Sequence, residues 1–152
     1  MIVSCDALLA LAAEHRRAGR TIALANGVFD LLHVGHLRYL QGAAQEADVL
    51  VVAVNEDAAV RQLKGADRPI VRETERAELV DALRGVDYVV LFGELTVGPL
   101  LQALRPDVHC KGTDYTVDTV PERAIVQTYG GRTAIVGDPK NHATRDIVAR
   151  LT

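Results

Sequence analysis

The sequence contains little cysteine, no long apolar run and no excess of positive charge. Its two cysteines, Cys5 and Cys110, stand far apart in no metal-binding or redox spacing, so we expect both to be reduced, and structural or incidental. No apolar run approaches the length of a membrane span, and the N-terminus lacks a signal-peptide pattern, which predicts a cytoplasmic protein without a membrane partner. The net charge of −3, with dispersed basic residues, argues against nucleic acid as a partner held by bulk electrostatics.

The motifs that most often mark a nucleotide or metal site are also missing. No G-x-G-x-x-G turn follows the first apolar run, and no P-loop is present, so dinucleotide binding loses its usual support. No H-E-x-x-H pattern or cysteine cluster occurs, and we therefore predict no metal held by the protein alone. A metal set made of His33, His36 and Asp30 stays open as an alternative at this point.

Apolar runs alternate with amphipathic stretches along the chain, whose 152 residues suit one domain. The predicted strands are residues 21–25, 49–55, 88–92, 108–111 and 133–136. The predicted helices are 34–45, 57–63, 73–83, 97–104 and 121–129, with one more before the first strand, capped by Ser4, and another from about Thr144. This alternation predicts an α/β fold: a Rossmann-like, doubly wound parallel sheet of five strands in a single domain over residues 1–152.

Polar segments follow the first and fourth predicted strands. Residues 26–30 read Asn-Gly-Val-Phe-Asp, and residues 111–115 read Lys-Gly-Thr-Asp-Tyr. In doubly wound sheets, ligands lie beyond the carboxyl ends of the strands, where the strand order reverses. If these two strands are neighbours at that point, the two polar segments face each other across one crevice.

The most informative segment joins the first strand to the next helix, where a glycine turn precedes two histidines. Gly27 lets the backbone approach an oxyanion, and the helix N-terminus presents free N–H groups and a partial positive charge. His33 and His36 fall on one face of the first helical turn and can hold the same phosphate. Such an arrangement suits the charge that develops on phosphorus during transfer. Helix capping or core packing by the two histidines is the structural alternative.

Other polar residues have an ordinary structural interpretation beside the functional one. Asn26 and Asp30 both suit turn and cap hydrogen bonds, and Asp30 can in addition hold Mg²⁺ or a hydroxyl of an acceptor. Lys64 has the setting of a surface lysine, and Arg76 belongs to a helix with the charge pattern of a solvated face. The residue types alone therefore leave all four open.

Two later clusters of charge also allow both interpretations. Lys111 ends a buried strand, where its charge is costly unless it meets a ligand or a local partner such as Asp114. Near the C-terminus, Thr144 can simply cap the last helix. A cap with free N–H groups, bordered by Lys140 and Arg145, also suits the oxygens of a triphosphate.

Residues 26–30, followed by the His-Val-Gly-His motif at 33–36, resemble the cytidylyltransferase-like nucleotidyltransferase superfamily, whose signature is H-x-G-H. Within it, the chain is most similar to the D-glycero-β-D-manno-heptose 1-phosphate adenylyltransferases. This finer likeness rests on residues 51–57, 63–65, 68–69, 86–90, 106–107, 111–115 and 130–131, and the whole resemblance runs from about Arg20 to Leu151. In that family the activity is either one half of a bifunctional kinase–adenylyltransferase or a stand-alone enzyme.

The resemblance implies transfer of AMP from ATP to the heptose 1-phosphate by in-line attack on the α-phosphorus, giving ADP-heptose and pyrophosphate, with Mg²⁺ carried by the ATP. His33 and His36 are then the catalytic contacts to phosphate, while Lys64 and Arg76 neutralise the triphosphate and the leaving pyrophosphate. Asp30 is expected to bind the acceptor, and a homodimer is implied. The residues expected to bind the nucleotide are Asn26, Gly27, Val28, Phe29, Gly35, Lys111, Gly112, Asp114, Lys140, Thr144 and Arg145.

One departure from the superfamily pattern bears on this assignment. A Ser/Thr-rich motif usually precedes the last helix, but residues 142–145 here read His-Ala-Thr-Arg, so Ala143 replaces a hydroxyl. Two alternatives therefore stay open beside the adenylyltransferase. One is a cytidylyltransferase for glycerol 3-phosphate or a related phosphate, and the other is a catalytically silent nucleotide-binding module.

Overall fold

Five parallel strands form one sheet in the computed structural model, which describes residues 1–139 and 144–151. The strand order is β3-β2-β1-β4-β5. The strands are β1 (Ile22–Gly27), β2 (Val49–Asn55), β3 (Tyr88–Phe92), β4 (Val108–Lys111) and β5 (Arg132–Ile135). The expected Rossmann-like, doubly wound sheet is confirmed, and each strand lies within two residues of its predicted bounds.

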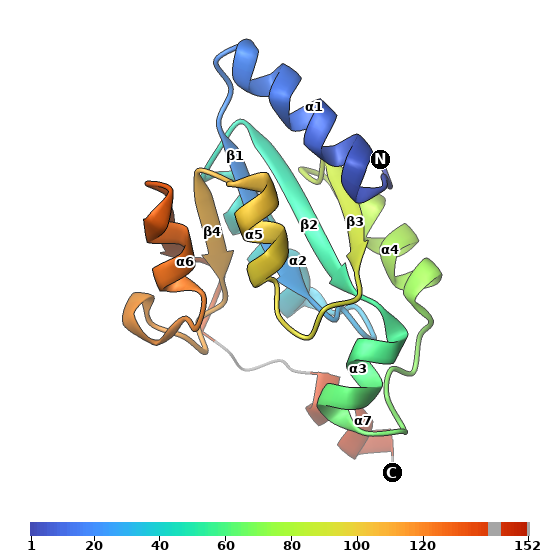
Figure 1. The fold of residues 1–152 in the computed structure, drawn as a ribbon. Coiled ribbons are helices and arrows are strands. Elements are labelled where there is room, and N and C mark those ends of the chain that lie inside the picture. Colours follow the sequence, from blue (N-terminus) through green and yellow to red (C-terminus); the bar gives the residue numbers. More distant parts are fainter. Residues whose placement is uncertain (140–143, 152) are drawn as a thin grey trace.

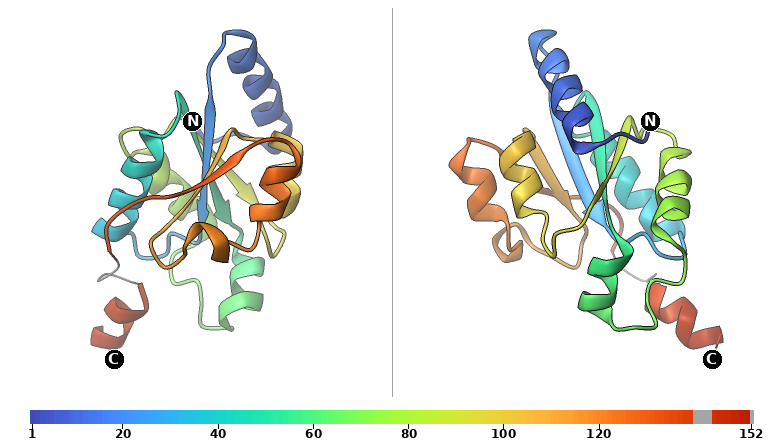
Figure 2. Two further views of the ribbon diagram at one scale, coloured as in Figure 1. Left: turned by 90° about the vertical axis from the view of Figure 1, so that its left-hand side faces the viewer. Right: turned by 45° about the vertical axis from the view of Figure 1, so that its right-hand side comes forward.

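Helices connect the strands and cover both faces of the sheet (Figure 1). They are α1 (Cys5–Arg17), α2 (Val34–Ala44), α3 (Asp57–Lys64), α4 (Glu73–Asp81), α5 (Gly98–Leu104), α6 (Arg123–Thr128), α7 (Thr144–Leu151) and the 3₁₀ helix η1 (Val117–Thr119). Helices α2 and α4 pack on one face, and α1, α5 and α6 on the other, as Figure 2 shows from two further directions. None of the described helices is both long and apolar enough to cross a membrane.

The sheet separates two apolar layers, because successive side chains of a strand point to opposite faces. In β1, Ala23 and Ala25 belong to the layer under α2 and α4, whereas Ile22 and Leu24 belong to the layer under α1 and α5. All of β2 is buried, as expected for a central parallel strand that is covered on both faces. The predicted cap of α1 is confirmed as well, since the Ser4 hydroxyl accepts a hydrogen bond from the N–H of Ala7 over 3.2 Å.

The strand order reverses between β1 and β4, which pair directly. Ala25 lies opposite Cys110 in this pair, so residues 26–30 and 111–115 leave the sheet together at its carboxyl edge. The chain after β1 continues to α2 on one face, and the chain after β4 continues through η1 to α6 on the other. The two polar segments are therefore neighbours at the switch point, as the sequence predicts.

Candidate functional site

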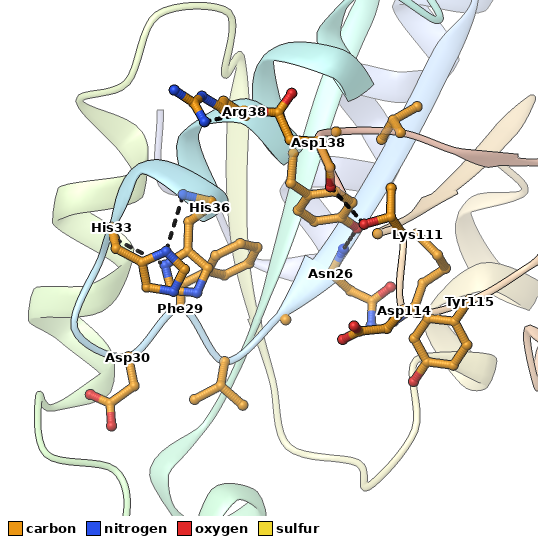
Figure 3. A pocket seen from close by; sticks show the side chains of 18 of the residues that line it. Asn26, Phe29, Asp30, His33, His36, Arg38, Lys111, Asp114, Tyr115 and Asp138 are labelled. Atoms are coloured by element: carbon orange, nitrogen blue, oxygen red, sulfur yellow. Dashed lines mark hydrogen bonds and ion pairs between the residues drawn. The ribbon is translucent and has the colours of Figure 1, made fainter. Parts of the chain in front are cut away.

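A cavity of about 330 Å³ opens at the carboxyl ends of β1 and β4. It is lined by residues 26–30, the first turns of α2, the end of α3 with the loop after it, residues 111–115 and residues 136–139. Figure 3 shows the two histidines on one wall, and Asn26, Lys111, Asp114 and Tyr115 on the wall across from them. A concave site of this size with a few convergent polar groups suits a small ligand.

Most of the residues expected to bind substrates meet in this cavity. The expected residues that line it are Asn26, Gly27, Val28, Phe29, Asp30, His33, Gly35, His36, Lys64, Lys111, Gly112 and Asp114. Lys140 lies outside the described residues, as do the side chains of Thr144 and Arg145 at the start of α7. Contact between any of these residues and a ligand stays a prediction.

His33 and His36 stand at the N-terminus of α2, where their rings stack with centroids 3.8 Å apart. His33 is the N-cap, and its Nδ1 accepts a hydrogen bond from the N–H of Gly35 over 3.1 Å. The Nδ1 of His36 accepts one from the N–H of His33 over 3.2 Å. Because Nδ1 is the acceptor, each neutral ring carries its proton on Nε2. Capping uses Nδ1 alone and both side chains line the cavity, so capping and phosphate binding are compatible.

The turn before α2 holds two residues other than glycine in the left-handed region, Phe29 at φ 54° and Leu31 at φ 49°. Such conformations cost free energy in bulky residues and persist only where surrounding contacts hold them. The buried Phe29 ring packs edge-on against His36, with centroids 5.4 Å apart, and stacks on Tyr39 at 6.4 Å. Phe29 therefore supports the His36 ring through packing.

Asp30 closes this turn by binding the loop that precedes α4. Its buried carboxylate accepts hydrogen bonds from the N–H groups of Ile70 and Val71, each over 2.9 Å, and from Arg68 Nε over 3.2 Å. Burial opposes ionisation of the carboxyl, but these hydrogen bonds outweigh it and hold the pKa of Asp30 below its ordinary value. Asp30 thus orders the loop, which is one of its two expected functions, and binding of the acceptor stays a prediction.

Asp30→Asn is expected to lower the free energy of unfolding by about 2 kcal/mol at neutral pH, because the amide loses charge-assisted hydrogen bonds. A carboxyl whose pKa is depressed by folding stabilises the protein above its unfolded pKa, about 4, and loses this contribution as the pH falls through the folded value. The difference between the unmodified protein and the variant should therefore shrink below about pH 4. Urea unfolding over a pH series measures it.

Asp138→Asn is the control for this prediction. The ion pair of Asp138 with Arg38 spans 2.7 Å, and both side chains are about half exposed, so its loss should change the free energy of unfolding by less than about 1 kcal/mol. An Asp30→Asn effect that is equally large at neutral pH and well below pH 4 would contradict the role assigned to the Asp30 carboxylate.

The structure does not bring Arg76 into the cavity, which differs from the expectation that it neutralises the triphosphate. The side chain is fully buried, and its guanidinium donates to Val71 O over 2.8 Å, to Val28 O over 2.7 Å and to Asp57 Oδ1 over 2.7 Å. These acceptors lie in the glycine turn, in the loop before α4 and at the start of α3. The charge pattern of α4 could not reveal this, because two of the three acceptors, in Val28 and Asp57, are distant in sequence. Arg76 is placed to hold the turn rather than a ligand.

Tyr39 is a residue of the site that sequence reasoning missed. Its hydroxyl donates a hydrogen bond to Cys110 O on β4 over 2.5 Å and accepts one from the N–H of Asn26 on β1 over 3.3 Å. Tyr39 therefore connects α2 to both β1 and β4. Burial raises the pKa of Tyr39 well above its ordinary value and keeps the hydroxyl protonated as a donor. A signal was available, because Tyr39 follows His36 by three residues and the two therefore share a helix face.

Arg68 also lines the cavity, although it was not among the expected site residues, and Thr113 does so as part of the polar segment after β4. The Nη2 of Arg68 is buried and makes no hydrogen bond to any described residue. The hydroxyl of Thr113 donates to Asp138 O over 2.6 Å and so joins the loop after β4 to the loop after β5. Lys111 on the same wall places its Nζ 4.9 Å from the ring centroid of Tyr115. Cationic side chains thus reach the cavity from both walls.

No metal-binding cluster is found in the part of the chain that the structure describes. No group of three His, Cys, Asp or Glu side chains among these residues is arranged to hold a metal ion. Both cysteines are free, with Cys5 exposed and Cys110 buried. Burial raises the pKa of the Cys110 thiol to about 12, so it is protonated at neutral pH.

Comparison with known proteins agrees with the H-x-G-H resemblance. The bifunctional protein HldE of Syntrophotalea carbinolica is 46% identical over 136 residues, which are 90% of this chain and 28% of the relative. HldE of Geobacter sulfurreducens is 42% identical over 150 residues, which are 99% of this chain and 31% of the relative. The chain therefore spans less than a third of the length of these curated relatives.

A solved structure and a family model agree with this relationship. The crystal structure of the lipopolysaccharide core biosynthesis protein from Thermoplasma volcanium matches with a TM-score of 0.69 and 28% sequence identity, covering 80% of this chain and 100% of that one. The model of the cytidylyltransferase-like family matches residues 24–148, which include the glycine turn, both histidines and the loop after β4. The chain belongs to the cytidylyltransferase-like family of nucleotidyltransferases.

Proposed function

We propose that this protein transfers AMP from ATP to D-glycero-β-D-manno-heptose 1-phosphate and releases pyrophosphate. The observation that carries the proposal is the pair of stacked imidazoles, fixed through Nδ1 by the helix cap, on a cavity whose other wall holds Lys111. The choice of substrate is supported by the HldE relatives, because the heptose adenylyltransferase that the sequence resembles forms one part of a bifunctional enzyme. The structural relative from Thermoplasma volcanium, a lipopolysaccharide core biosynthesis protein, is in keeping with a heptose product.

The two histidines act on the phosphorus that is transferred. Their Nε2–H groups are donors held on one helix face, so both can bind oxygens of the α-phosphate. Negative charge on these oxygens grows as the phosphorus becomes five-coordinate. Donors that are already oriented stabilise this charge without reorganisation at the moment of reaction.

Cationic side chains of the cavity neutralise the triphosphate. Lys64, at the end of α3, and Lys111, at the end of β4, both line the cavity. Arg68 adds a guanidinium whose Nη2 has no hydrogen-bond partner among the described residues. We assign these three side chains to the β- and γ-phosphates and to the pyrophosphate that leaves.

The acceptor needs no strong base, because its phosphate is already anionic near neutral pH. One of its oxygens attacks the α-phosphorus in line, a new P–O bond forms, and the bond from the α-phosphorus to the bridging oxygen breaks. Pyrophosphate departs with the electron pair of that bond. No covalent enzyme intermediate forms on this route.

Mg²⁺ fits this site as an ion that is bound mainly by the phosphates of the nucleotide and not by a set of protein ligands. The described residues contain no cluster of three metal ligands, and Mg²⁺ commonly keeps water and phosphate oxygens as most of its ligands. Asp114 is a carboxylate of the cavity lining that could face the ion. When bound, Mg²⁺ would supply positive charge to the leaving pyrophosphate.

The test is pyrophosphate release with Mg²⁺, with ATP or CTP offered in turn against the heptose 1-phosphate and glycerol 3-phosphate. Release with ATP and the heptose phosphate alone is the expected result. Release with CTP and glycerol phosphate would replace the proposed substrates while leaving the phosphate site in place. Nucleotide binding without release in any pairing would favour a catalytically silent module.

We further propose that the protein acts as a homodimer in the cytoplasm, where ATP is available. The dimer is an inference from the family resemblance. Light scattering of the purified protein tests it, and a monomeric mass at assay concentration would contradict it.

A further inference from the structure

His109 is a fully buried histidine on β4 that the proposed mechanism does not use. Its Nε2 lies 2.8 Å from Oδ1 of Asn26, at the end of β1. Its other ring nitrogen, Nδ1, is buried and has no hydrogen-bond partner among the residues that the structure describes. A buried polar ring is costly unless its hydrogen bonds compensate. The hydrogen bond to Asn26 is thus the contact that compensates for burying the His109 ring.

The His109 ring is neutral and acts as the donor in this contact. Burial, together with the nearby Lys111 cation, lowers the pKa of His109 to about 3. A neutral imidazole carries one N–H. With the proton on Nδ1, a buried N–H would lack an acceptor, which folded proteins rarely tolerate. With the proton on Nε2, the ring donates to Asn26 Oδ1, and the amide nitrogen of Asn26 points away from His109.

The backbone of Asn26 is held independently of His109. Its N–H donates to the hydroxyl of Tyr39 over 3.3 Å, and the residue lies opposite Ala53 in the pairing of β1 with β2. The hydrogen bond from His109 therefore sets the rotation of the side-chain amide rather than the course of the strand. This separation makes the effect of His109 on the amide measurable by itself.

Asn26 faces the cavity together with Lys111 and Asp114, on the wall across from the histidine pair (Figure 3). We infer that His109 is a positioning residue: by donating Nε2–H to Asn26 Oδ1, it turns the Asn26 amide NH₂ into the cavity as a donor to a phosphate oxygen of the nucleotide. The identity of the ligand rests on the proposed function, whereas the hydrogen bond between His109 and Asn26 does not.

The binding test compares two substitutions of His109. His109→Gln places an amide N–H near the position of Nε2, whereas His109→Leu fills the space without a donor. Affinity for α,β-methylene-ATP with Mg²⁺, measured by calorimetry, should fall about tenfold in His109→Leu, in keeping with one lost hydrogen bond. It should stay within about threefold of the unmodified protein in His109→Gln. Adding His109→Leu to Asn26→Ala should cause no further loss, because the two residues act through one contact.

Val108→Ala is the matched control, because Val108 is buried on the same strand but belongs to the layer under α2 and α4. It should lower the denaturation midpoint and leave the affinity unchanged. An unchanged affinity in His109→Leu, or a further loss in the double variant, would overturn the inference. If the leucine variant does not fold, His109→Gln decides: retained affinity supports the inference, and a tenfold loss overturns it.

A second readout is independent of nucleotide. The ¹⁵N chemical shifts of the His109 ring should show the Nε2–H tautomer, unchanged between about pH 5 and pH 8. The Nδ1–H tautomer, or a ring that becomes charged in this interval, would overturn the inference. If the Nε2–H tautomer is found but the unmodified protein binds no nucleotide, the proposed function and the assigned ligand fail, and the orientation of Asn26 stands.

Discussion

Turnover of the His33→Ala variant is expected to fall by about 10²–10³-fold, since one oriented donor to the α-phosphate is lost. His36→Ala should lower kcat for pyrophosphate release to a similar extent. The structure adds a second effect, because His33 caps α2 through the N–H of Gly35. Loss of an N-cap costs about 1 kcal/mol of stability, so urea unfolding must accompany the assay.

His33→Asn separates the two functions of this side chain. Asparagine is a strong N-cap whose Oδ1 can replace Nδ1 as the acceptor of the Gly35 N–H. It does not reach as far as Nε2 of the imidazole. We therefore expect the free energy of unfolding to return to that of the unmodified protein while kcat stays low. Restored turnover in this variant, or full turnover in both alanine variants, would refute the assignment of the histidines to phosphate.

Arg76→Met is expected to lower the free energy of unfolding by about 3 kcal/mol, which is among the larger effects of a single substitution. The change leaves the carbonyls of Val28 and Val71 without their donor and Asp57 without its ion pair. Arg76→Lys should also destabilise the protein, because a single ammonium cannot span three acceptors as the planar guanidinium does. Urea unfolding of both variants measures the effect.

Catalysis should suffer in Arg76→Lys through the turn that Arg76 holds. A displacement of about 1 Å in the turn that carries the histidines can lower turnover by about 10²-fold. Arg72→Lys is the control at the start of the same helix, since Arg72 is largely exposed and its ion pair with Glu75 spans 3.9 Å. It should change stability by less than about 0.5 kcal/mol. If Arg76→Lys kept full stability but lost turnover, the result would contradict the structural role and support direct contact between Arg76 and phosphate.

The parts of the site that the sequence predicted well are those built from neighbours in the chain. The apolar run of β1, the glycine turn and the histidine spacing on α2 all lie within residues 22–36. Their arrangement follows from local rules of strand, turn and helix formation. Lys111 was also predicted to lie near these residues, because the alternation of strands and helices predicted a parallel sheet whose strand order reverses beside the first strand.

The charged residues that the sequence interpreted least well are those whose partners are distant. Asp30 meets the N–H of Val71 across 41 positions, and Arg76 meets Val28 O across 48. In the sequence, Asp30 is open to turn bonding or ligand binding, and only the family resemblance makes Arg76 a candidate for a ligand contact. In the structure the loop before α4 binds the Asp30 carboxylate, whereas the Arg76 guanidinium is held by Asp57, that loop and the glycine turn.

By itself, the sequence determined the α/β fold, the position of the glycine turn that lines the cavity, and the family. These follow from apolar periodicity and from a short motif whose residues are adjacent in the chain. Only the tertiary structure decided which polar side chains face the cavity and which hold its walls. His109 and Asn26 are 83 positions apart, and no local pattern relates them. Their contact exists because β1 and β4 pair at the centre of the sheet, where a buried imidazole and an amide come within hydrogen-bond distance.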